Sequence, residues 1–345
     1  MRIAVLVPNF SEFSGDARVA ELQVKELIAS GNEVDIYCLR GTLDVDGARK
    51  FEIGMPSSPV CERVYRLVFP LHLTKLFRTA FRMRDYDLVI SHLYPLSTVG
   101  MLSKFLSGTH YTFWYHGIPP PKMYQHRYER LYMKAFIKLT GISTRNATDR
   151  VAVSRAAAEE YRRYVKQNCR VKYNQPDLSR FKRDITGIGV RKEFGFGDRP
   201  VILNVGRICP QKGAHLLLEA FEVVKKEIPD SILVLVGKPT YDYYFENLKK
   251  MTTSDVCFVG FVEDRRLPEF YAMCDVYATG TLWEAHNVPI LEAQAMGKRV
   301  IGFDIPSLRE GIDQQGILVP VGDTSELGKA IVAAIKEKNR GIQDA

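Results

Sequence analysis

Two glutamates eight positions apart form the pattern with the most chemical content in this sequence. Glu284 and Glu292 lie either side of a Pro289 whose following residues have the composition of a helix, which Gly297 can end. Glu284 is therefore expected in the loop before the helix and Glu292 in its first turn. Free N–H groups at a helix start can bind a phosphate, and carboxylates can accept hydrogen bonds from sugar hydroxyls. Taken alone, Glu292 is equally explained by the preference of helix starts for acidic residues.

Arg207 and Lys212 supply two positive charges directly after the apolar run Val201–Val205. That run is expected to be a strand, and Gly206 lets the chain turn tightly at its end. A guanidinium suits bidentate contact with a phosphate, and an ammonium acts as a point charge, so the two could hold one diphosphate. Solvated loop cations would give the same pattern. The position at the carboxyl end of a strand, where ligands bind in open α/β sheets, favours a phosphate site.

The first expected strand is followed by a turn containing Ser14, Gly15 and Asp16 and by a helix over Val19–Ala29. This turn does not have the G-x-G-x-x-G pattern, which argues against a nicotinamide or flavin dinucleotide site. Backbone N–H groups around Gly15 could still bind an anion at the helix start. An ordinary strand–helix turn explains the pattern equally well.

Short β-branched runs alternate with amphipathic stretches along the whole chain. Near-continuous apolar strands separated by helices indicate parallel sheets covered on both faces. Turn and linker residues gather around 173–200, which predicts two Rossmann-like, doubly wound α/β domains, residues 1–176 and 177–345, facing a central cleft. The expected strands are Ile3–Val7, Val34–Leu39, Val64–Phe69, Leu88–Ser91, Tyr111–His116, Val151–Ser154, Val201–Val205, Ile232–Val236, Cys257–Phe261, Val276–Thr279, Val300–Gly302 and Ile317–Val319.

The composition excludes several classes of protein. No run supplies the roughly 18 apolar residues of a membrane-spanning helix, and the segment Met1–Val7 resembles a buried strand rather than a signal peptide. The six cysteines are scattered, without a C-x-x-C pair, which argues against a zinc site and a disulfide framework and favours a reducing, cytoplasmic location. Asp44-Val45-Asp46 has the form of an acidic metal-binding motif, but no other feature supports it, and a solvated acidic turn explains it better.

The net charge of +8 is concentrated in one half of the chain. Residues 1–180 hold 27 Lys or Arg and 17 Asp or Glu, whereas residues 181–345 hold 21 and 23. Two stretches, 73–84 and 127–139, combine an apolar stripe at helical spacing with Lys and Arg elsewhere. Basic amphipathic helices suit an anionic membrane surface, although each stripe could simply pack on its own sheet. No recognisable nucleic-acid-binding motif is present, so nucleic acid is not an expected partner.

Together these motifs resemble the GT-B glycosyltransferases of group 1 that share an E-x7-E donor signature, as in glycogen-synthase-like and mannosyltransferase-like enzymes. Each motif alone is weak, but the ordered set covers nearly the whole chain. The matching pieces are Gly15 at the N-terminal glycine loop, Gly31-Asn32-Glu33-Val34 for G-H-E-V, His116-Gly117 for H-G, Ala152-Val153-Ser154 for A-V-S, Asn174 with Asp177 and Phe181 for N-G-V-D…F, Gly206-Arg207…Lys212-Gly213 for G-R…K-G, and Glu284…Glu292-Ala293 for E-x7-E-A.

The resemblance implies a role for each matched position in using a nucleoside-diphosphate sugar. Arg207 and Lys212 would neutralise the diphosphate leaving group, Glu284 would bind the donor sugar, and Glu292 would bind the ribose. His116 would contact the donor sugar near the reacting centre. No metal and no cofactor are implied, because the two cations and a helix N-terminus offset the phosphate charge. Other expected donor-binding residues are Gly15, Gly206, Phe261, Val262, His286, Asn287 and Val288.

The same resemblance implies transfer with retention to a hydroxyl acceptor, which the basic half suggests is lipid-linked and presented at the inner face of a membrane. The chain departs from the family where E-G-F-G is replaced by Glu284-Ala285-His286-Asn287. Because Asn tolerates left-handed backbone, Asn287 is expected to preserve the turn. The departure leaves open a non-catalytic scaffold that binds a sugar nucleotide. The same architecture also leaves open a sugar-nucleotide 2-epimerase.

Overall fold

The computed structural model describes residues 1–11 and 15–343. The expected anion-binding turn therefore falls partly outside the described residues, because Ser14 is not among them. The chain divides into two compact units, Met1–Asn174 and Gln175–Ala345. This division lies two residues before the one expected from the sequence.

The N-terminal unit is built on a seven-stranded sheet in which all the strands run parallel, in the order β3-β2-β1-β4-β5-β6-β7. The strand order reverses between β1 and β4, which is where ligands bind in a doubly wound sheet. The strands are β1 (Arg2–Phe10), β2 (Glu33–Gly41), β3 (Ala48–Glu52), β4 (Leu88–His92), β5 (His110–Tyr115), β6 (Asp149–Ala152) and β7 (Arg170–Val171).

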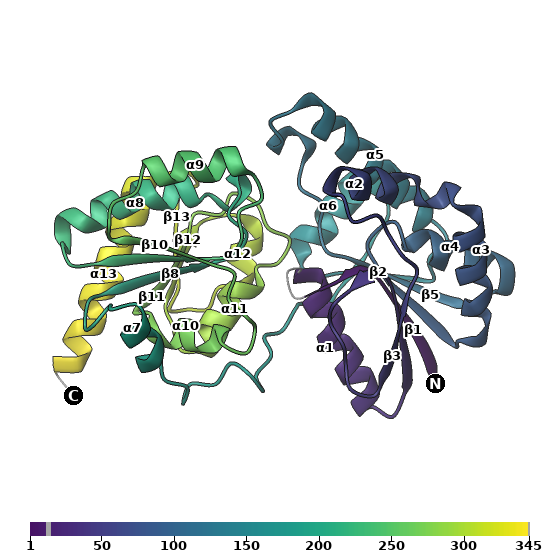
Figure 1. The fold of residues 1–345 in the computed structure, drawn as a ribbon, viewed down its shortest axis with the longest axis horizontal. Helices are drawn as coiled ribbons and strands as arrows, with labels where there is room; N and C mark the ends of the chain where they lie inside the picture. Colours follow the sequence, from purple (N-terminus) through teal and green to yellow (C-terminus); the bar gives the residue numbers. More distant parts are fainter. Residues whose placement is uncertain (12–14, 344–345) are drawn as a thin grey trace. The chain divides into compact units, whose positions relative to one another are not determined.

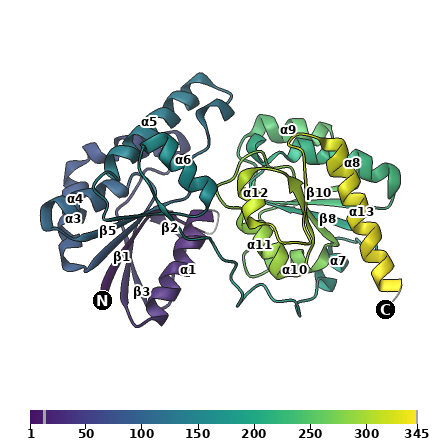
Figure 2. The same ribbon diagram turned by 180° about the vertical axis from the view of Figure 1, so that it is seen from behind.

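Helices connect these strands and cover both faces of the sheet (Figures 1 and 2). Helix α6 shows how local sequence sets an end, because the Ser154 side chain accepts a hydrogen bond from the Ala157 N–H at 2.9 Å and caps the helix. The A-V-S motif thus includes a helix cap. The helices are α1 (Gly15–Ala29), α2 (Pro59–Val68), η1 (Phe69–Leu71), α3 (Leu73–Arg82), η2 (Met83–Asp85), α4 (Ser97–Ser107), η3 (Pro121–Met123), α5 (Arg127–Ser143) and α6 (Arg155–Val165).

The C-terminal unit has a six-stranded parallel sheet in the order β10-β9-β8-β11-β12-β13, which reverses between β8 and β11. Figure 1 shows α8 and α9 on one face and α10 and α11 on the other. The strands are β8 (Val201–Val205), β9 (Ile232–Val236), β10 (Val256–Gly260), β11 (Val276–Thr279), β12 (Val300–Phe303) and β13 (Ile317–Val319). The helices are α7 (Ile188–Glu193), η4 (Pro210–Lys212), α8 (Ala214–Glu227), α9 (Asp242–Lys250), α10 (Leu267–Met273), α11 (Val288–Ala295), α12 (Pro306–Gly311) and α13 (Thr324–Gln343).

The prediction of two doubly wound parallel sheets is confirmed. β8, β9, β11 and β13 have the predicted bounds because each is a short apolar run, buried by helices and bounded by turn residues. β3 and β7 were not predicted: β3 has the mixed sequence Ala-Arg-Lys-Phe-Glu, and β7 has only two residues.

The predicted strand Val64–Phe69 is wrong, because these residues belong to α2 and η1. Pro59 stands at the start of α2, where its missing N–H costs nothing. Glu62 and Arg66, one helical turn apart, pair at 2.7 Å. Helical spacing places Val60 and Val64 on an exposed face, with exposed fractions of 72% and 56%, instead of in a sheet.

Within the described residues, none of the helices combines the length and the apolar composition that crossing a bilayer requires.

Candidate functional site

The expected donor-binding residues of the C-terminal unit gather at the carboxyl edge of its sheet. Gly206, Arg207 and Lys212 follow β8, and Glu284 follows β11, the neighbouring strand across the point where the strand order reverses. Phe261 and Val262 follow β10. Because all the strands are parallel, these loops emerge at the same edge. The topology therefore collects residues that are far apart in sequence.

Two glycines let the β8 and β11 loops approach closely enough for Lys212 to reach Glu284. Gly213 has a φ of +62°, and a Cβ there would lie 1.8 Å from the carbonyl oxygen of Gly280. The Leu282 N–H also donates to the Gln211 carbonyl at 2.9 Å, which joins the loops. The Lys212 ammonium donates to a Glu284 carboxylate oxygen as a close ion pair. Any side chain at Gly213 would separate the loops.

The Lys212 side chain is four-fifths buried, so its charge depends on its neighbours. Burial, and then the charge of Arg207, lowers the pKa of Lys212 to about 7. Contact with an anion, whether the Glu284 carboxylate or a phosphate, favours the charged ammonium. Arg207 itself is exposed. The site thus pairs one enclosed cation with one accessible cation.

Gly206 and Gly237 lie at a second close approach between loops. The φ of +154° at Gly206 falls in the region that favours glycine, and a Cβ on Gly237 would lie 1.9 Å from the Gly206 carbonyl oxygen. Beyond this contact, the Gly237 N–H donates to the Gly260 carbonyl at 2.7 Å. These two contacts hold the turns after β8, β9 and β10 against one another, directly before Phe261. The Lys238 ammonium lies 5.1 Å from the centre of the Phe261 ring.

Asn287 precedes the first residue of α11 and is 4% exposed. Its backbone has φ −77° and ψ 96°, so the expectation of a left-handed turn at Asn287 is wrong. Extended backbone suffices before a helix whose second residue is Pro289. Among the described residues, the buried Asn287 Oδ1 atom has no hydrogen-bond partner. Such an oxygen can accept a hydrogen bond from a ligand that binds beside the N-terminus of α11.

Glu292 lies in the second turn of α11, because the helix begins at Val288; its predicted place in the first turn is wrong. The helix-start preference for acids therefore does not explain it. A Glu292 carboxylate oxygen accepts a hydrogen bond from the Tyr271 hydroxyl at 2.7 Å. Tyr271 is fully buried on α10, and its hydroxyl fixes the direction of the half-buried carboxylate.

The two residues that depart from the family pattern, Ala285 and His286, are both buried. Neither needs a left-handed backbone, since the only non-glycine residues of the described chain with positive φ are Leu93 and Lys166. Burial lowers the pKa of His286 to about 4, opposed in part by the charge of Glu310. A neutral imidazole therefore lies between Glu284 and the start of α11.

In the N-terminal unit, Gly15 starts α1, and a Cβ on it would meet open space among the described residues. His116 directly follows β5, and Gly117 after it has a φ of +79°. The Ile118 N–H donates to a Glu160 carboxylate oxygen at 2.8 Å, which fixes this turn. Burial lowers the pKa of His116 to about 4, with the charge of Asp16 on α1 opposing. His116 is therefore neutral near pH 7.

Several residues of these sites were not predicted. Gly280 lies against Gly213, and the Tyr271 hydroxyl donates to Glu292. His92 contacts His116, and Gln23 contacts His92. His92 directly follows the predicted strand Leu88–Ser91, and this position at the carboxyl end of a strand was the available signal.

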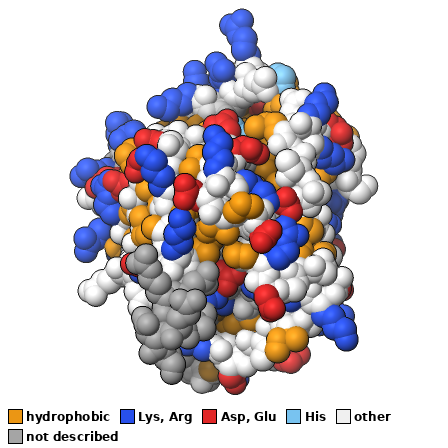
Figure 3. Space-filling model, turned by 90° about the vertical axis from the view of Figure 1, so that its left-hand side faces the viewer, with side chains coloured by type: hydrophobic (Ala, Val, Ile, Leu, Met, Phe, Trp, Pro, Cys, Tyr) orange, Lys and Arg blue, Asp and Glu red, His pale blue; other side chains and the backbone are white. Residues whose placement is uncertain are grey.

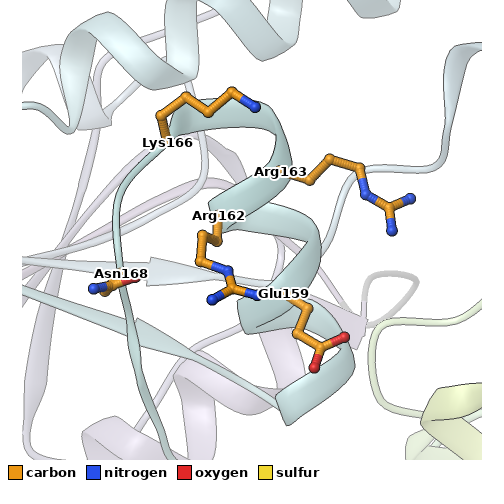
Figure 4. Close-up of a pocket in the computed structure, with 5 residues that line it drawn as sticks. All are labelled: Glu159, Arg162, Arg163, Lys166 and Asn168. Atoms are coloured by element: carbon orange, nitrogen blue, oxygen red, sulfur yellow. The ribbon is translucent and has the colours of Figure 1, made fainter.

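A shallow hollow of about 440 Å³ lies along the C-terminal half of α6, and none of the predicted site residues lines it. Figure 4 shows Arg162 beside Glu159, whereas Arg163 extends in another direction. In a parallel sheet the connecting helix runs back toward the amino edge. Lys166, at the far end of α6, is therefore remote from the carboxyl edge that carries His116. Glu159, Arg162, Arg163, Lys166 and Asn168 line this hollow.

Comparison with known families matches both units. A family described as glycosyl transferases group 1 matches residues 190–342, and one described as glycosyltransferase family 4 matches residues 13–180. The chain belongs to the group 1 glycosyltransferases. The predicted family membership is therefore confirmed.

Curated relatives match this group 1 glycosyltransferase over part of their length. It is 32% identical over 158 residues to a GDP-mannose-dependent alpha-(1-6)-phosphatidylinositol monomannoside mannosyltransferase of Mycolicibacterium smegmatis. This match covers 39% of this chain and 41% of the relative. It is also 30% identical over 121 residues to spore coat protein SA of Bacillus subtilis, a match that covers 32% of each protein. The matches thus span less than half of either relative.

Solved structures match this glycosyltransferase over nearly all of its length. Anabaena Alr3699/HepE in complex with UDP and glucose has a TM-score of 0.77 at 19% identity, covering 99% of this chain and 91% of that one. WaaG, a glycosyltransferase involved in lipopolysaccharide biosynthesis, has a TM-score of 0.73 at 15% identity, covering 99% and 95%. At these identities the similarity establishes the fold, which is GT-B.

Proposed function

We propose that this glycosyltransferase moves a hexose from a nucleoside-diphosphate sugar to a hydroxyl acceptor, with retention and without a metal. The contact between Lys212 and Glu284 carries the proposal, together with Asn287 three residues later, whose Oδ1 atom has no hydrogen-bond partner among the described residues. A cation, a carboxylate and a helix N-terminus at one edge of a sheet are complementary to a sugar diphosphate.

Each residue then has a distinct task in the donor site. Lys212 and Arg207 offset the charge that develops on the leaving diphosphate, which is the contribution a metal would otherwise make. Glu284 accepts hydrogen bonds from the sugar, and Glu292, held by Tyr271, accepts them from the ribose. Phe261 and Val262 present backbone groups to the base. His116, by family resemblance, acts on the donor sugar from the N-terminal unit.

A transfer assay with a panel of sugar nucleotides tests this function. Purified protein is incubated with UDP-, GDP- and ADP-hexoses and a membrane lipid extract, and release of the nucleoside diphosphate and labelling of lipid are measured. We expect one base to support turnover. Binding without release of the diphosphate would reject the transferase and support a sugar-nucleotide-binding scaffold. Conversion of the donor to its 2-epimer would identify an epimerase.

We further propose a lipid-linked acceptor, presented at the cytoplasmic face of an anionic membrane. Similarity to a phosphatidylinositol monomannoside mannosyltransferase supports a lipid acceptor. The charge of α2, α3 and α5 supports the membrane surface, since these helices carry nine Lys or Arg and two acids. Both acids, Glu62 and Glu129, are largely buried beside Arg residues. The exposed charge of the three helices is therefore positive.

The apolar stripe of α3 divides between two faces. Leu76 and Ala80 are buried, whereas Leu73, Phe77 and Phe81 form an exposed row with one residue per turn. The alternative that the whole stripe packs on its own sheet thus does not describe α3. Elsewhere the molecule differs: Figure 3 shows Lys and Arg interspersed with Asp and Glu on the face that α8 and α13 help to form. An apolar row on a helix that carries three cations and no acid suits insertion at a lipid headgroup boundary.

Replacing Phe77 and Phe81 with serine is expected to weaken binding to vesicles of phosphatidylglycerol and phosphatidylcholine by at least about tenfold, since each ring loses apolar burial. Co-sedimentation at low salt measures the change. The matched control is Tyr243→Ser with Met251→Ser, two exposed apolar residues near α9. Equal weakening by both double variants, or failure of the unmodified protein to bind, would contradict the proposed docking surface.

A further inference from the structure

The end of β4 carries a histidine that contacts the histidine assigned to the reacting centre. His92 is the last residue of β4 and is fully buried. In the parallel register it lies beside Trp114 of β5, and His116 lies two residues beyond on the same side of that strand. The centres of the His92 and His116 rings lie 5.0 Å apart, and the ring planes are inclined by 28°.

One hydrogen bond joins these two rings, and a second joins His92 to α1. His92 Nδ1 lies 2.8 Å from His116 Nε2, and His92 Nε2 lies 2.9 Å from the carboxamide oxygen Oε1 of Gln23. Gln23 is itself buried on α1. The resulting sequence of contacts joins α1, β4 and the turn after β5, around the point where the strand order of this unit reverses.

The donor and acceptor at each nitrogen follow from Gln23. A carboxamide oxygen only accepts, so His92 Nε2 carries a proton and donates it. Burial lowers the pKa of His92 well below its usual value, so this ring is neutral and its Nδ1 atom accepts. His116 Nε2 must then donate. Because His116 is also neutral, its remaining nitrogen, Nδ1, keeps a free lone pair.

We propose that Gln23 and His92 are positioning residues that hold His116 in the Nε2–H tautomer, with Nδ1 available to accept a hydrogen bond from a substrate hydroxyl. The proposal rests on the proposed function, in which His116 contacts the donor sugar. It adds two residues that make no contact with substrate and that act by fixing the proton and the plane of the imidazole.

Two substitutions at His92 separate positioning from packing. Asparagine keeps a polar atom near the Nδ1 position, whereas glutamine keeps one near the Nε2 position. His92→Asn preserves the contact with His116, and His92→Gln preserves the contact with Gln23 instead. We expect His92→Gln to lower kcat by about 10- to 100-fold, as for other groups that orient a functional histidine. The KM for the donor stays unchanged, and His92→Asn retains most of kcat.

Nitrogen-15 NMR of histidine-labelled protein reads the tautomers without any substrate. At pH 7 we expect both His92 and His116 as Nε2–H, and we expect His92→Gln to make the His116 tautomer mixed. His110→Gln, an exposed histidine at the start of β5, is the control and should change neither signal nor kcat. Gln23→Leu on α1 repeats the test outside the sheet, and thermal melting identifies any variant that fails to fold.

The outcomes distinguish this inference from the proposed function. An Nδ1–H tautomer for His116 in the unmodified protein would overturn the positioning role. Equal loss of kcat in His92→Asn and His92→Gln would also overturn it, because packing alone would then explain the loss. Absence of sugar transfer by the unmodified protein would reject the proposed function, and the NMR signals would still decide the positioning.

Discussion

Replacing Lys212 with alanine is expected to reduce kcat/KM for the sugar-nucleotide donor by about 10²- to 10³-fold, the range for losing one preorganised group that stabilises developing negative charge. Lys212 is the enclosed member of the cation pair, held beside Glu284 by the approach of Gly213 to Gly280. A charge in a site with little water acts more strongly than one in solvent. The measurement is steady-state release of the nucleoside diphosphate at a saturating acceptor concentration.

Loss of Lys212 also leaves the Glu284 carboxylate without its contact cation. Part of the defect could then come from repulsion between this carboxylate and the diphosphate. The double variant Lys212→Ala with Glu284→Gln separates the two causes, because it removes the unpaired charge. We expect the double variant to remain as defective as the single one. Recovery of turnover in the double variant would refute the role of Lys212 as the leaving-group cation.

A surface lysine provides the control for this experiment. Lys249 on α9 is half exposed and pairs with Glu246 one turn away. Lys249→Ala should leave kcat/KM unchanged, since exposed pairs of this kind contribute little to stability. Unchanged turnover in Lys212→Ala would be incompatible with the proposed donor site.

Replacing Glu292 with glutamine is expected to raise the KM for the donor and lower kcat/KM by about 10²-fold, the cost of removing hydrogen bonds made by a charged group. Glutamine keeps one acceptor oxygen, so the hydrogen bond from the Tyr271 hydroxyl is retained. What is lost is the negative charge and the second acceptor, which the ribose hydroxyls need. The fold around α10 and α11 should therefore be unaffected.

This design separates binding from structure. If Glu292 served only to accept from Tyr271, Glu292→Gln would behave like the unmodified protein, and its role in donor binding would be refuted. Tyr271→Phe tests the orientation of the carboxylate, and we expect a smaller rise in KM. Glu246→Gln, on exposed α9, is the matched control for loss of a carboxylate. Isothermal titration with the nucleoside diphosphate measures the affinity of each variant.

Much of the fold could be predicted from the sequence because its determinants are local. Each strand of the C-terminal unit is a short apolar run, most of them ended by glycine or a polar residue, and burial on both faces requires such runs. The prediction failed where local patterns are ambiguous. Val64–Phe69 is rich in β-branched residues, yet Pro59 and the Glu62–Arg66 pair belong to a helix, whose exposed face carries the valines.

The chemical types and spacing of the donor residues are likewise properties of the sequence. It placed Arg207 and Lys212 after a strand and Glu284 before a helix, and the family resemblance assigned them one substrate. Only the tertiary structure brought Lys212 and Glu284, 72 residues apart, into contact. That contact depends on Gly280, whose missing side chain matters only because another loop lies against it.

The same reason limits what sequence could say about His116. Its position after a strand was predictable, but its partner His92 lies 24 residues away on another strand. Gln23, which contacts His92 in turn, lies a further 69 residues away on a helix. The order of strands around β1 and β4 decides that these three side chains meet. The sequence determined which groups are available, and the long-range pairing of the strands decided which of them act together.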